Sequence, residues 1–299
     1  MALNSSLVGT SGESLAGEID TRWAMAYAAA LGDALPCYFD TASPAGIVAH
    51  PLFPVCFEWP VMVAMRATFD RSGLTQDEAR RGVHASHDLI IHRQIRPPAR
   101  VRTRATVAGI ERRKPGAYQL TRLETVDVAG APICTSWYGS IYRDVAVAGP
   151  DRMAEVVPAP AMPRAVERQP ISEIPIPVAA GLAHVYTECA RIFNPIHTDA
   201  GVAQQAGLPA IILHGTATLA LAVSQIVAAE TRQDPGRVSR IAGRFGAMVM
   251  MRSQLTLRIC AREQAHDGDR IFFEVLNHQN RPAIRDGLIV LAPPNGDRR

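Results

Sequence analysis

The order of features repeats on either side of a Pro- and Ala-rich stretch in the middle of the chain. Residues 153–175 (MAEVVPAPAMPRAVERQPISEIP) lack a periodic apolar pattern, which is typical of an exposed linker. Before and after it, the chain runs through a short turn motif, an apolar helical segment and several alternating strands. The sequence therefore predicts two units, residues 1–152 and 176–299, that share one plan.

The second unit shows this plan most clearly. Residues 211–231 (IILHGTATLALAVSQIVAAET) are nearly all apolar, with the larger residues at helical spacing, which predicts a buried helix. Residues 254–263 (QLTLRICARE) alternate as a strand does, and a turn signal at 279–282 (QNRP) separates two further strands. One helix followed by antiparallel strands is an α+β pattern.

The first unit follows the same order. Turn signals at 114–116 (KPG) and 129–132 (AGAP) divide its strands, and 75–78 (TQDE) is a capping-box sequence that predicts a short helix. Residues 32–40 (GDALPCYFD) can be laid over 191–199 (RIFNPIHTD), and both segments hold a proline. A long helix wrapped by an antiparallel sheet, twice in one chain, would let the two sheets cover each other's open edge.

Composition excludes several classes of partner. The 299 residues carry a net charge of +3, and basic residues are not massed with aromatics, so we expect no nucleic acid. No apolar run is long enough to span a bilayer, and the first residues lack a secretion signal. The five cysteines form no CxxC pair, so we expect a cytoplasmic protein without disulfides or zinc. A homo-oligomer stays open.

Residues 193–217 (FNPIHTDAGVAQQAGLPAIILHGTA) carry the most specific motif. This stretch resembles the signature of the MaoC-like dehydratases, the (R)-specific enoyl-CoA hydratases, in which an Asn-Pro-Ile/Leu-His turn precedes a His-Gly pair that opens the central helix. The first half resembles the degenerate N-terminal unit of two-unit members. The resemblance implies a double hot-dog fold, with a degenerate first unit and a second unit that carries the hydratase motif.

The resemblance also implies a reaction, namely interconversion of a 2-enoyl-CoA and a 3-hydroxyacyl-CoA. We expect His197 to act as general base and acid, Asn194 to order the site, and the Gly215 N–H at a helix start to polarise the thioester carbonyl. Asp199 is expected only to cap the following helix. We expect no metal and no redox cofactor, since coenzyme A or a carrier-protein pantetheine belongs to the substrate.

One position departs from the family's pattern. The residue two before the Asn is an Asp in the family, where it partners the His in activating water, but here it is Ile192. The first unit has the reverse arrangement, with Asp33 at the Asp position and Tyr38 at the His position. We expect Asp33 to lie too far from His197 to replace the missing carboxylate.

Three interpretations of Ile192 stay open. Glu188, one helical turn earlier, could stand in for the Asp, with Tyr186 and Cys189 as weaker candidates. Alternatively, a substrate could bring its own carboxylate, as a branched or dicarboxylic acyl-CoA would. Finally, the chain could be a catalytically silent acyl-thioester-binding or scaffold subunit. A thioesterase on this fold is a smaller possibility.

Three histidines, His84, His87 and His92, lie close together in the first half. They lack the carboxylate and the helical register of a metalloprotease motif, so we expect no metal and a solvated or hydrogen-bonded role. Arg102, Arg104 and Arg122 are candidates for contacts with coenzyme A phosphates, but the sequence does not choose among them.

Overall fold

The computed structural model describes residues 2–66, 72–155, 157, 170–265 and 268–293. The helices of the first half are α1 (Thr21–Ala30), α2 (Pro54–Arg66) and α3 (Gln76–Arg80), with the 3-10 helices η1 (Ser5–Leu7) and η2 (Pro36–Tyr38). Its strands are β1 (Ala2–Asn4), β2 (Leu15–Ile19), β3 (Gly82–Ile91), β4 (Ala99–Arg113), β5 (Gly116–Asp127), β6 (Pro132–Arg143), β7 (Ala146–Ala148) and β8 (Arg152–Met153).

The second half repeats the order of helix, turn, helix and strands. Its helices are α4 (Leu182–Ala190), α5 (Ala200–Gln205) and α6 (Gly215–Glu230), with the 3-10 helices η4 (Pro195–His197) and η5 (Pro235–Arg237). Its strands are β9 (Ser172–Val178), β10 (Val238–Phe245), β11 (Ser253–Ala265), β12 (Gly268–Leu276) and β13 (Pro282–Leu291). These elements confirm the α+β class.

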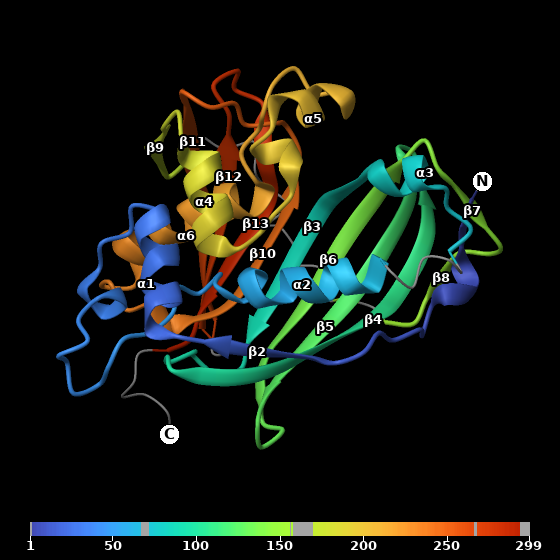
Figure 1. Cartoon of the computed structure of the whole chain (residues 1–299). Coiled ribbons are helices and arrows are strands. Elements are labelled where there is room, and N and C mark those ends of the chain that lie inside the picture. The colour runs from blue at the N-terminus through green and yellow to red at the C-terminus, as the bar shows by residue number, and fades with distance from the viewer. Residues whose placement is uncertain (1, 67–71, 156, 158–169, 266–267, 294–299) are drawn as a thin grey trace.

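One sheet runs through both halves. Its strand order is β2-β4-β5-β6-β3-β10-β13-β12-β11-β9, with β8 paired to β4, and each of these pairs is antiparallel. The halves meet where β3 pairs with β10, and there Arg240 binds Asp88 at 2.6 Å. In Figure 1, helix α2 crosses the first half of the sheet and α6 lies against the second half. The open edges are therefore joined into one sheet, as predicted.

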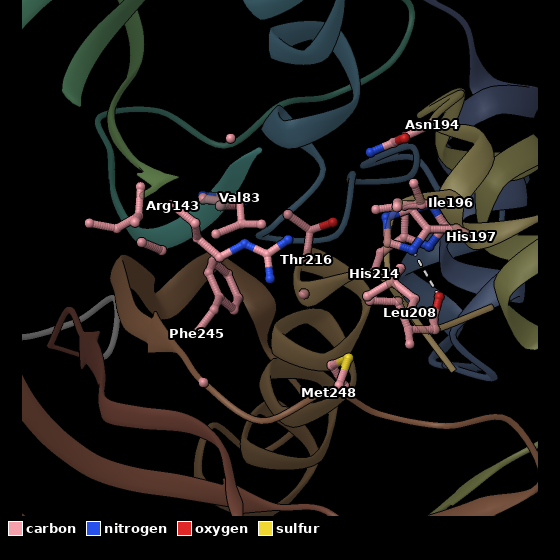
Figure 2. Close-up of a pocket in the computed structure, with 18 of the residues that line it drawn as sticks. Val83, Arg143, Asn194, Ile196, His197, Leu208, His214, Thr216, Phe245 and Met248 are labelled. Atoms are coloured by element: carbon pink, nitrogen blue, oxygen red, sulfur yellow. Dashed lines mark hydrogen bonds between the residues drawn. The ribbon is translucent and has the colours of Figure 1, made fainter. Parts of the chain in front are cut away.

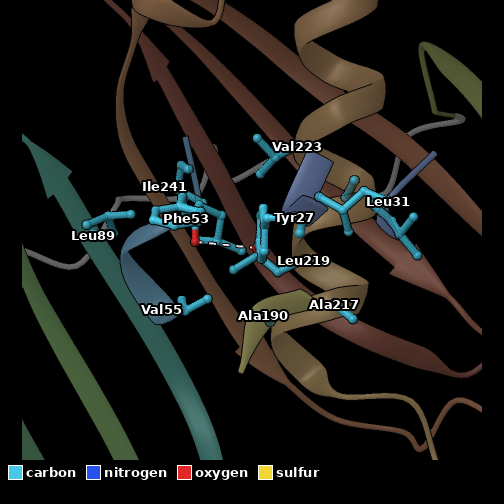
Figure 3. Packing of buried hydrophobic residues seen from close by; sticks show 14 of the residues in the cluster. Tyr27, Leu31, Phe53, Val55, Leu89, Ala190, Ala217, Leu219, Val223 and Ile241 are labelled. Atoms are coloured by element: carbon cyan, nitrogen blue, oxygen red, sulfur yellow. Dashed lines mark hydrogen bonds between the residues drawn. The ribbon is translucent and has the colours of Figure 1, made fainter. Parts of the chain in front are cut away.

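The largest buried cluster extends across the two halves. Tyr27, Phe53 and Leu89 of the first half belong to the same buried cluster as Leu219 and Ile241 of the second (Figure 3). Helix α1 packs against α4, so the two equivalent short helices face each other beside the central helices. The two halves thus form one packed body.

The local predictions are largely confirmed. Thr75 caps α3 with both bonds of a capping box, and the alternating residues of β11 place Leu255, Leu257 and Ile259 in the core. The predicted linker ends too late, because Ser172 already pairs with Ile259 and strand β9 begins there. Residues 156 and 158–169 of that linker lie outside the described residues.

Two further observations concern the described residues. No helix among them is long and apolar enough to cross a membrane. All five cysteines, namely Cys37, Cys56, Cys134, Cys189 and Cys260, are free thiols.

Candidate functional site

A cavity of about 1560 Å³ opens between the two halves of the molecule. The second half contributes the motif residues His197, His214 and Gly215 to its wall. The first half contributes residues of α2, β3 and the end of β6, among them Glu58 and Arg143. Figure 2 shows His197 and His214 together on one side of this cavity, with Arg143 and Phe245 opposite. The motif therefore faces a space that both units enclose.

The Asn-Pro-Ile-His turn aims His197 at this cavity. Pro195 opens the 3-10 helix η4, where its fixed φ suits the first helical position, and His197 closes it. The imidazole is 8% exposed, and its Nδ1 lies 2.8 Å from the carbonyl oxygen of Ile212. A carbonyl only accepts, so Nδ1 carries the proton and donates it, which leaves Nε2 with a free lone pair.

Burial keeps His197 neutral. Loss of solvation lowers its pKa to about 4, against a smaller opposite effect of the Ile212 carbonyl. Its ring stacks on His214, with centroids 3.7 Å apart. Burial, and then the neighbouring His197, lower the pKa of His214 to about 2. Both imidazoles are therefore uncharged at neutral pH, and His197 can accept a proton.

Gly215 is the first residue of α6, where backbone N–H groups have no intrahelical partner. A Cβ built on Gly215 would lie 2.9 Å from Cδ1 of the Phe245 ring, so glycine lets this ring pack directly on the helix start. His214 is the residue before the helix, and its Nε2 lies 3.2 Å from Thr187 Oγ1 on α4. The helix start is thus fixed by packing on one side and by a hydrogen bond on the other.

The stand-in role predicted for Glu188 is wrong in its geometry. Helix α4 ends at Ala190 and Arg191 adopts a left-handed conformation with φ 57°, so Ile192 does not continue the helical turn from Glu188. Glu188 is exposed, whereas Ile192 is 5% exposed and lines the cavity. The α4 residue that reaches the site is Thr187, through His214.

The two weaker candidates also point elsewhere. Tyr186 is fully buried, and its hydroxyl donates to Thr216 Oγ1 at 3.1 Å. It therefore stabilises the first turn of α6. Cys189 is half-buried, and its backbone carbonyl accepts from the Trp23 indole at 2.9 Å. Neither residue lines the described part of the cavity.

The remaining motif residues have separate places. Asn194 lies at the cavity wall beside η4 as the residue before it, and its side chain makes no cap hydrogen bond (Figure 2). Asp199 accepts from the backbone N–H of Val202 at 3.0 Å, which confirms that it caps α5. The structure therefore brings His197, Asn194 and Gly215 to one cavity and leaves Asp199 outside it.

Among the three histidines of the first half, His87 is neither solvated nor hydrogen-bonded to a described residue, contrary to the prediction. His87 is 1% exposed and His84 is half-buried, and both line the cavity. His92 is exposed and lies 2.9 Å from Thr135 Oγ1, as a surface histidine would. Across the described ranges, no group of three or more His, Cys, Asp or Glu side chains could hold a metal ion.

The cavity is rich in positive charge. The acidic side chains of its described lining are Asp77 and Glu58. The basic ones are more numerous, namely Arg80, Arg81, Arg113, Lys114, Arg143, Arg244, Arg281 and Arg285. None of the arginines singled out from the sequence is among them, and Arg122 instead forms ion pairs with Glu124 and Glu155. No pattern in the sequence predicts this set of basic residues, because strand ends and loops far apart in the chain supply it.

The equivalent position in the first half is a buried polar cluster. Tyr38 ends η2 as His197 ends η4, and it is fully buried. His50 lies beside it, with ring centroids 5.9 Å apart, and bonds Ser224 Oγ at 3.1 Å. Asp33 is 8% exposed, and neither it nor Tyr38 lines the cavity that holds His197. Asp33 therefore does not complete the His197 site, as predicted.

The fold and this site define a duplicated hot-dog protein whose described cavity takes its motif residues from the second unit, and comparisons with known proteins agree. Residues 162–280 match the MaoC-like domain family, and residues 6–136 match the FAS1-like dehydratase domain region. The second half of the chain therefore carries a MaoC-like domain, and the first half matches a dehydratase region of the FAS1-like type.

Solved structures share the whole fold. A MaoC-like dehydratase from Phytophthora capsici superposes with a TM-score of 0.81 at 17% identity, covering 98% of each chain. A Mycobacterium tuberculosis protein described as having a double hot-dog fold superposes with a TM-score of 0.60 at 16% identity, covering 95% of this chain and 96% of that one. At such identities the likeness shows the fold alone.

Two curated relatives match over shorter stretches. The peroxisomal enoyl-CoA hydratase 2 of Arabidopsis thaliana is 43% identical over 53 residues, which are 18% of this chain and 17% of that enzyme. An enoyl-CoA hydratase of Mycobacterium tuberculosis is 30% identical over 128 residues, which are 43% of this chain and 41% of that one. The chain thus matches less than half the length of either relative.

Proposed function

We propose that this protein is a hydro-lyase that interconverts a 2-enoyl-CoA and a 3-hydroxyacyl-CoA. The observation that carries the proposal is the state of His197. It is neutral, its Nδ1–H is held by the Ile212 carbonyl, and it lines the same cavity as the start of α6. A base with a free lone pair beside unpaired helix N–H groups supplies the two functions that hydration of a conjugated thioester needs.

The proposed reaction needs one proton carrier. His197 Nε2 takes a proton from water while the hydroxyl oxygen bonds to C3, and the C2–C3 π electrons move toward the thioester oxygen. The N–H of Gly215 donates to that oxygen as its negative charge grows. The imidazolium then returns its proton to C2 as the carbonyl re-forms. Dehydration follows the same steps in reverse, so the protein side supplies both general base and general acid in one residue.

Ile192 favours a second candidate function, a catalytically silent acyl-thioester-binding or scaffold subunit. It places an apolar side chain in the cavity wall at the position where the family resemblance implies a carboxylate, so water would be held by fewer groups. A single proton-transfer group contributes roughly 10² to 10⁴ in rate, so a site with half of its usual pair could still turn over slowly.

The excess of basic side chains around the cavity supports a polyanionic substrate such as a coenzyme A thioester. Coenzyme A or a carrier-bound pantetheine would enter as part of the substrate, without a separate cofactor. Three points stay predictions. They are that the substrate carries its own carboxylate, that the protein is cytoplasmic, and that it forms a homo-oligomer.

The test is steady-state hydration of crotonyl-CoA, mesaconyl-CoA and a long-chain 2-enoyl-CoA, followed as loss of enoyl thioester absorbance. The proposal expects turnover on at least one of them, together with its loss in His197→Ala. Binding of acyl-CoA without turnover on the whole panel would instead favour the silent subunit.

A further inference from the structure

The part of the cavity wall that the first half supplies carries several polar side chains. Helix α2 contributes Glu58, strand β3 contributes His84 and His87, and strand β6 contributes Tyr138. A polar wall is costly in a pocket for a purely apolar chain, because every buried polar group needs a partner.

The two histidines share one face of β3 because of an irregularity in the strand. In a regular strand, residues three apart point to opposite faces. Here the register shifts between His84 and Ser86, so His84 pairs with Ser140 and His87 pairs with Tyr138. Those partners are two residues apart on β6 and share a face, so both imidazoles point to the cavity side. The bulge therefore brings a second titratable ring to this wall.

The imidazole of His87 makes no hydrogen bond to any described residue. It is 1% exposed, and among the described residues neither of its ring nitrogens has a hydrogen-bond partner. The Nε2 of His84 is likewise buried without a described partner, and the two rings lie 5.4 Å apart. A buried donor left unpaired costs stability, so a group that pairs with it on binding would recover that cost. The pocket thus lacks a hydrogen-bonding group at this point.

Glu58 adds a second polar group to the same wall. It is 3% exposed and accepts from Ser136 Oγ at 2.5 Å, and burial raises its pKa to about 7. A cavity wall that carries neutral imidazoles and a carboxyl that is easily protonated suits an uncharged oxygen better than a carboxylate, because a second negative charge would be repelled by the ionised form of Glu58. The chemistry that fits is a hydroxyl or a keto group.

This wall is connected to the start of α6 through Phe245. That ring packs against Gly215 on one side, and on the other its centroid lies 4.5 Å from that of His84. An acyl chain whose thioester oxygen is held at Gly215 would therefore pass Phe245 on its way to His84 and His87. Figure 2 shows Phe245 on the same side of the cavity as Val83, which precedes His84 on β3.

We propose that the acyl group of the substrate carries a hydroxyl or keto oxygen, a few carbons beyond the reacting double bond, and that His87 together with Glu58 binds it. This specificity role rests on the proposed function, since it assigns the acyl part of the same thioester. It makes the protein selective for oxygenated acyl chains over plain hydrocarbon chains. If the protein binds only plain hydrocarbon chains, water instead pairs with His87. The test below distinguishes a substrate oxygen from water at this position.

The test measures binding and does not require turnover. Calorimetric titration compares hexanoyl-CoA, 5-hydroxyhexanoyl-CoA, 6-hydroxyhexanoyl-CoA and 5-oxohexanoyl-CoA against wild type, His87→Phe and His87→Gln. The control is His92→Phe, which alters the exposed histidine that follows the same strand. We expect at least one oxygenated ligand to bind wild type about tenfold more tightly than hexanoyl-CoA, the value of one hydrogen bond. Comparing the affinities of the hydroxyhexanoyl and oxohexanoyl thioesters shows whether a hydroxyl or a keto oxygen is preferred.

In His87→Phe we expect that preference to vanish while hexanoyl-CoA binds as well as before or better. His87→Gln, which keeps a donor and an acceptor, should retain part of it, and His92→Phe all of it. Equal affinity of wild type for the four ligands would overturn the inference, as would an equal loss for all of them in both His87 variants. If the preference holds but no enoyl thioester is hydrated, the proposed function fails and the inference stands.

Discussion

The hydroxyl oxygens of Tyr27 and Tyr186 lie 3.3 Å apart in the core. The two residues are 159 positions apart in the sequence, as Tyr38 and His197 are, so each tyrosine holds the same place in its own unit. They meet where α1 packs against α4, which marks the axis that relates the two units. From this shared point the two sites diverge, because only the one that contains His197 opens into the cavity.

The state of His197 predicts the pH dependence of activity. Because burial lowers the pKa of His197 to about 4, its neutral form persists well below the usual titration range of an imidazole. We expect kcat/KM for an enoyl-CoA to stay level from pH 8 to about 5.5 and to fall toward pH 4. The measurement is a pH profile with short exposures and a circular dichroism check of folding. A midpoint near 6.5 in folded protein would contradict this account.

Ile192 predicts a gain of function. Replacing this cavity residue by Asp restores the carboxylate of the family's pattern two residues before Asn194. We expect Ile192→Asp to raise kcat by roughly tenfold to a hundredfold, while burying a carboxylate lowers the free energy of unfolding. The control is Ile192→Asn, which has nearly the same shape but cannot take up a proton. Equal kcat in the two variants would show that a carboxylate at position 192 does not contribute to catalysis.

Glu58 predicts a pH-dependent effect on stability. Its pKa in the folded protein is about 7 against 4.5 for the ordinary group, so between these values the unfolded chain ionises while the folded protein stays protonated. The free energy of unfolding therefore falls as pH rises through this window, by about 3 kcal/mol in total. Glu58→Gln removes this loss, so we expect it to stabilise the protein more at pH 8 than at pH 5.

Urea unfolding at these two pH values checks that prediction. Glu188→Gln is the matched control, because Glu188 is an exposed glutamate of the second unit and should change stability little at either pH. If the Glu58→Gln variant differs from wild type by the same amount at both pH values, the assigned pKa of Glu58 is wrong.

The sequence predicted the parts of the site that are local in the chain. Pro195 and Asp199 determine the turn and the helix cap around His197 by their own backbone preferences, and Gly215 marks the helix start. The stand-in role of Glu188 failed because it assumed that the helix continues to Ile192, whereas Arg191 ends it in a left-handed conformation. No residue pattern near Arg191 signals that ending.

The polar wall of the first unit was missed for a different reason. Alternation predicts that His84 and His87 point to opposite faces of a strand, and only the bulge between His84 and Ser86 places them together. Glu58 lies within an apolar helical segment, where the sequence alone does not reveal which strand it faces. Side chains that meet only through the pairing of distant strands cannot be placed from one sequence.

The central claim is that the second unit alone carries the chemistry, and matched variants at the two equivalent positions test it most directly. The measurement is kcat/KM for the best enoyl-CoA in wild type, His197→Ala and Tyr38→Phe. Tyr38 is fully buried with no described partner for its hydroxyl, so losing that oxygen should not disturb the fold. We expect a loss of roughly 10² to 10⁴ in His197→Ala and a change within about twofold in Tyr38→Phe. Equal losses in the two variants, or full activity in His197→Ala, would contradict the account.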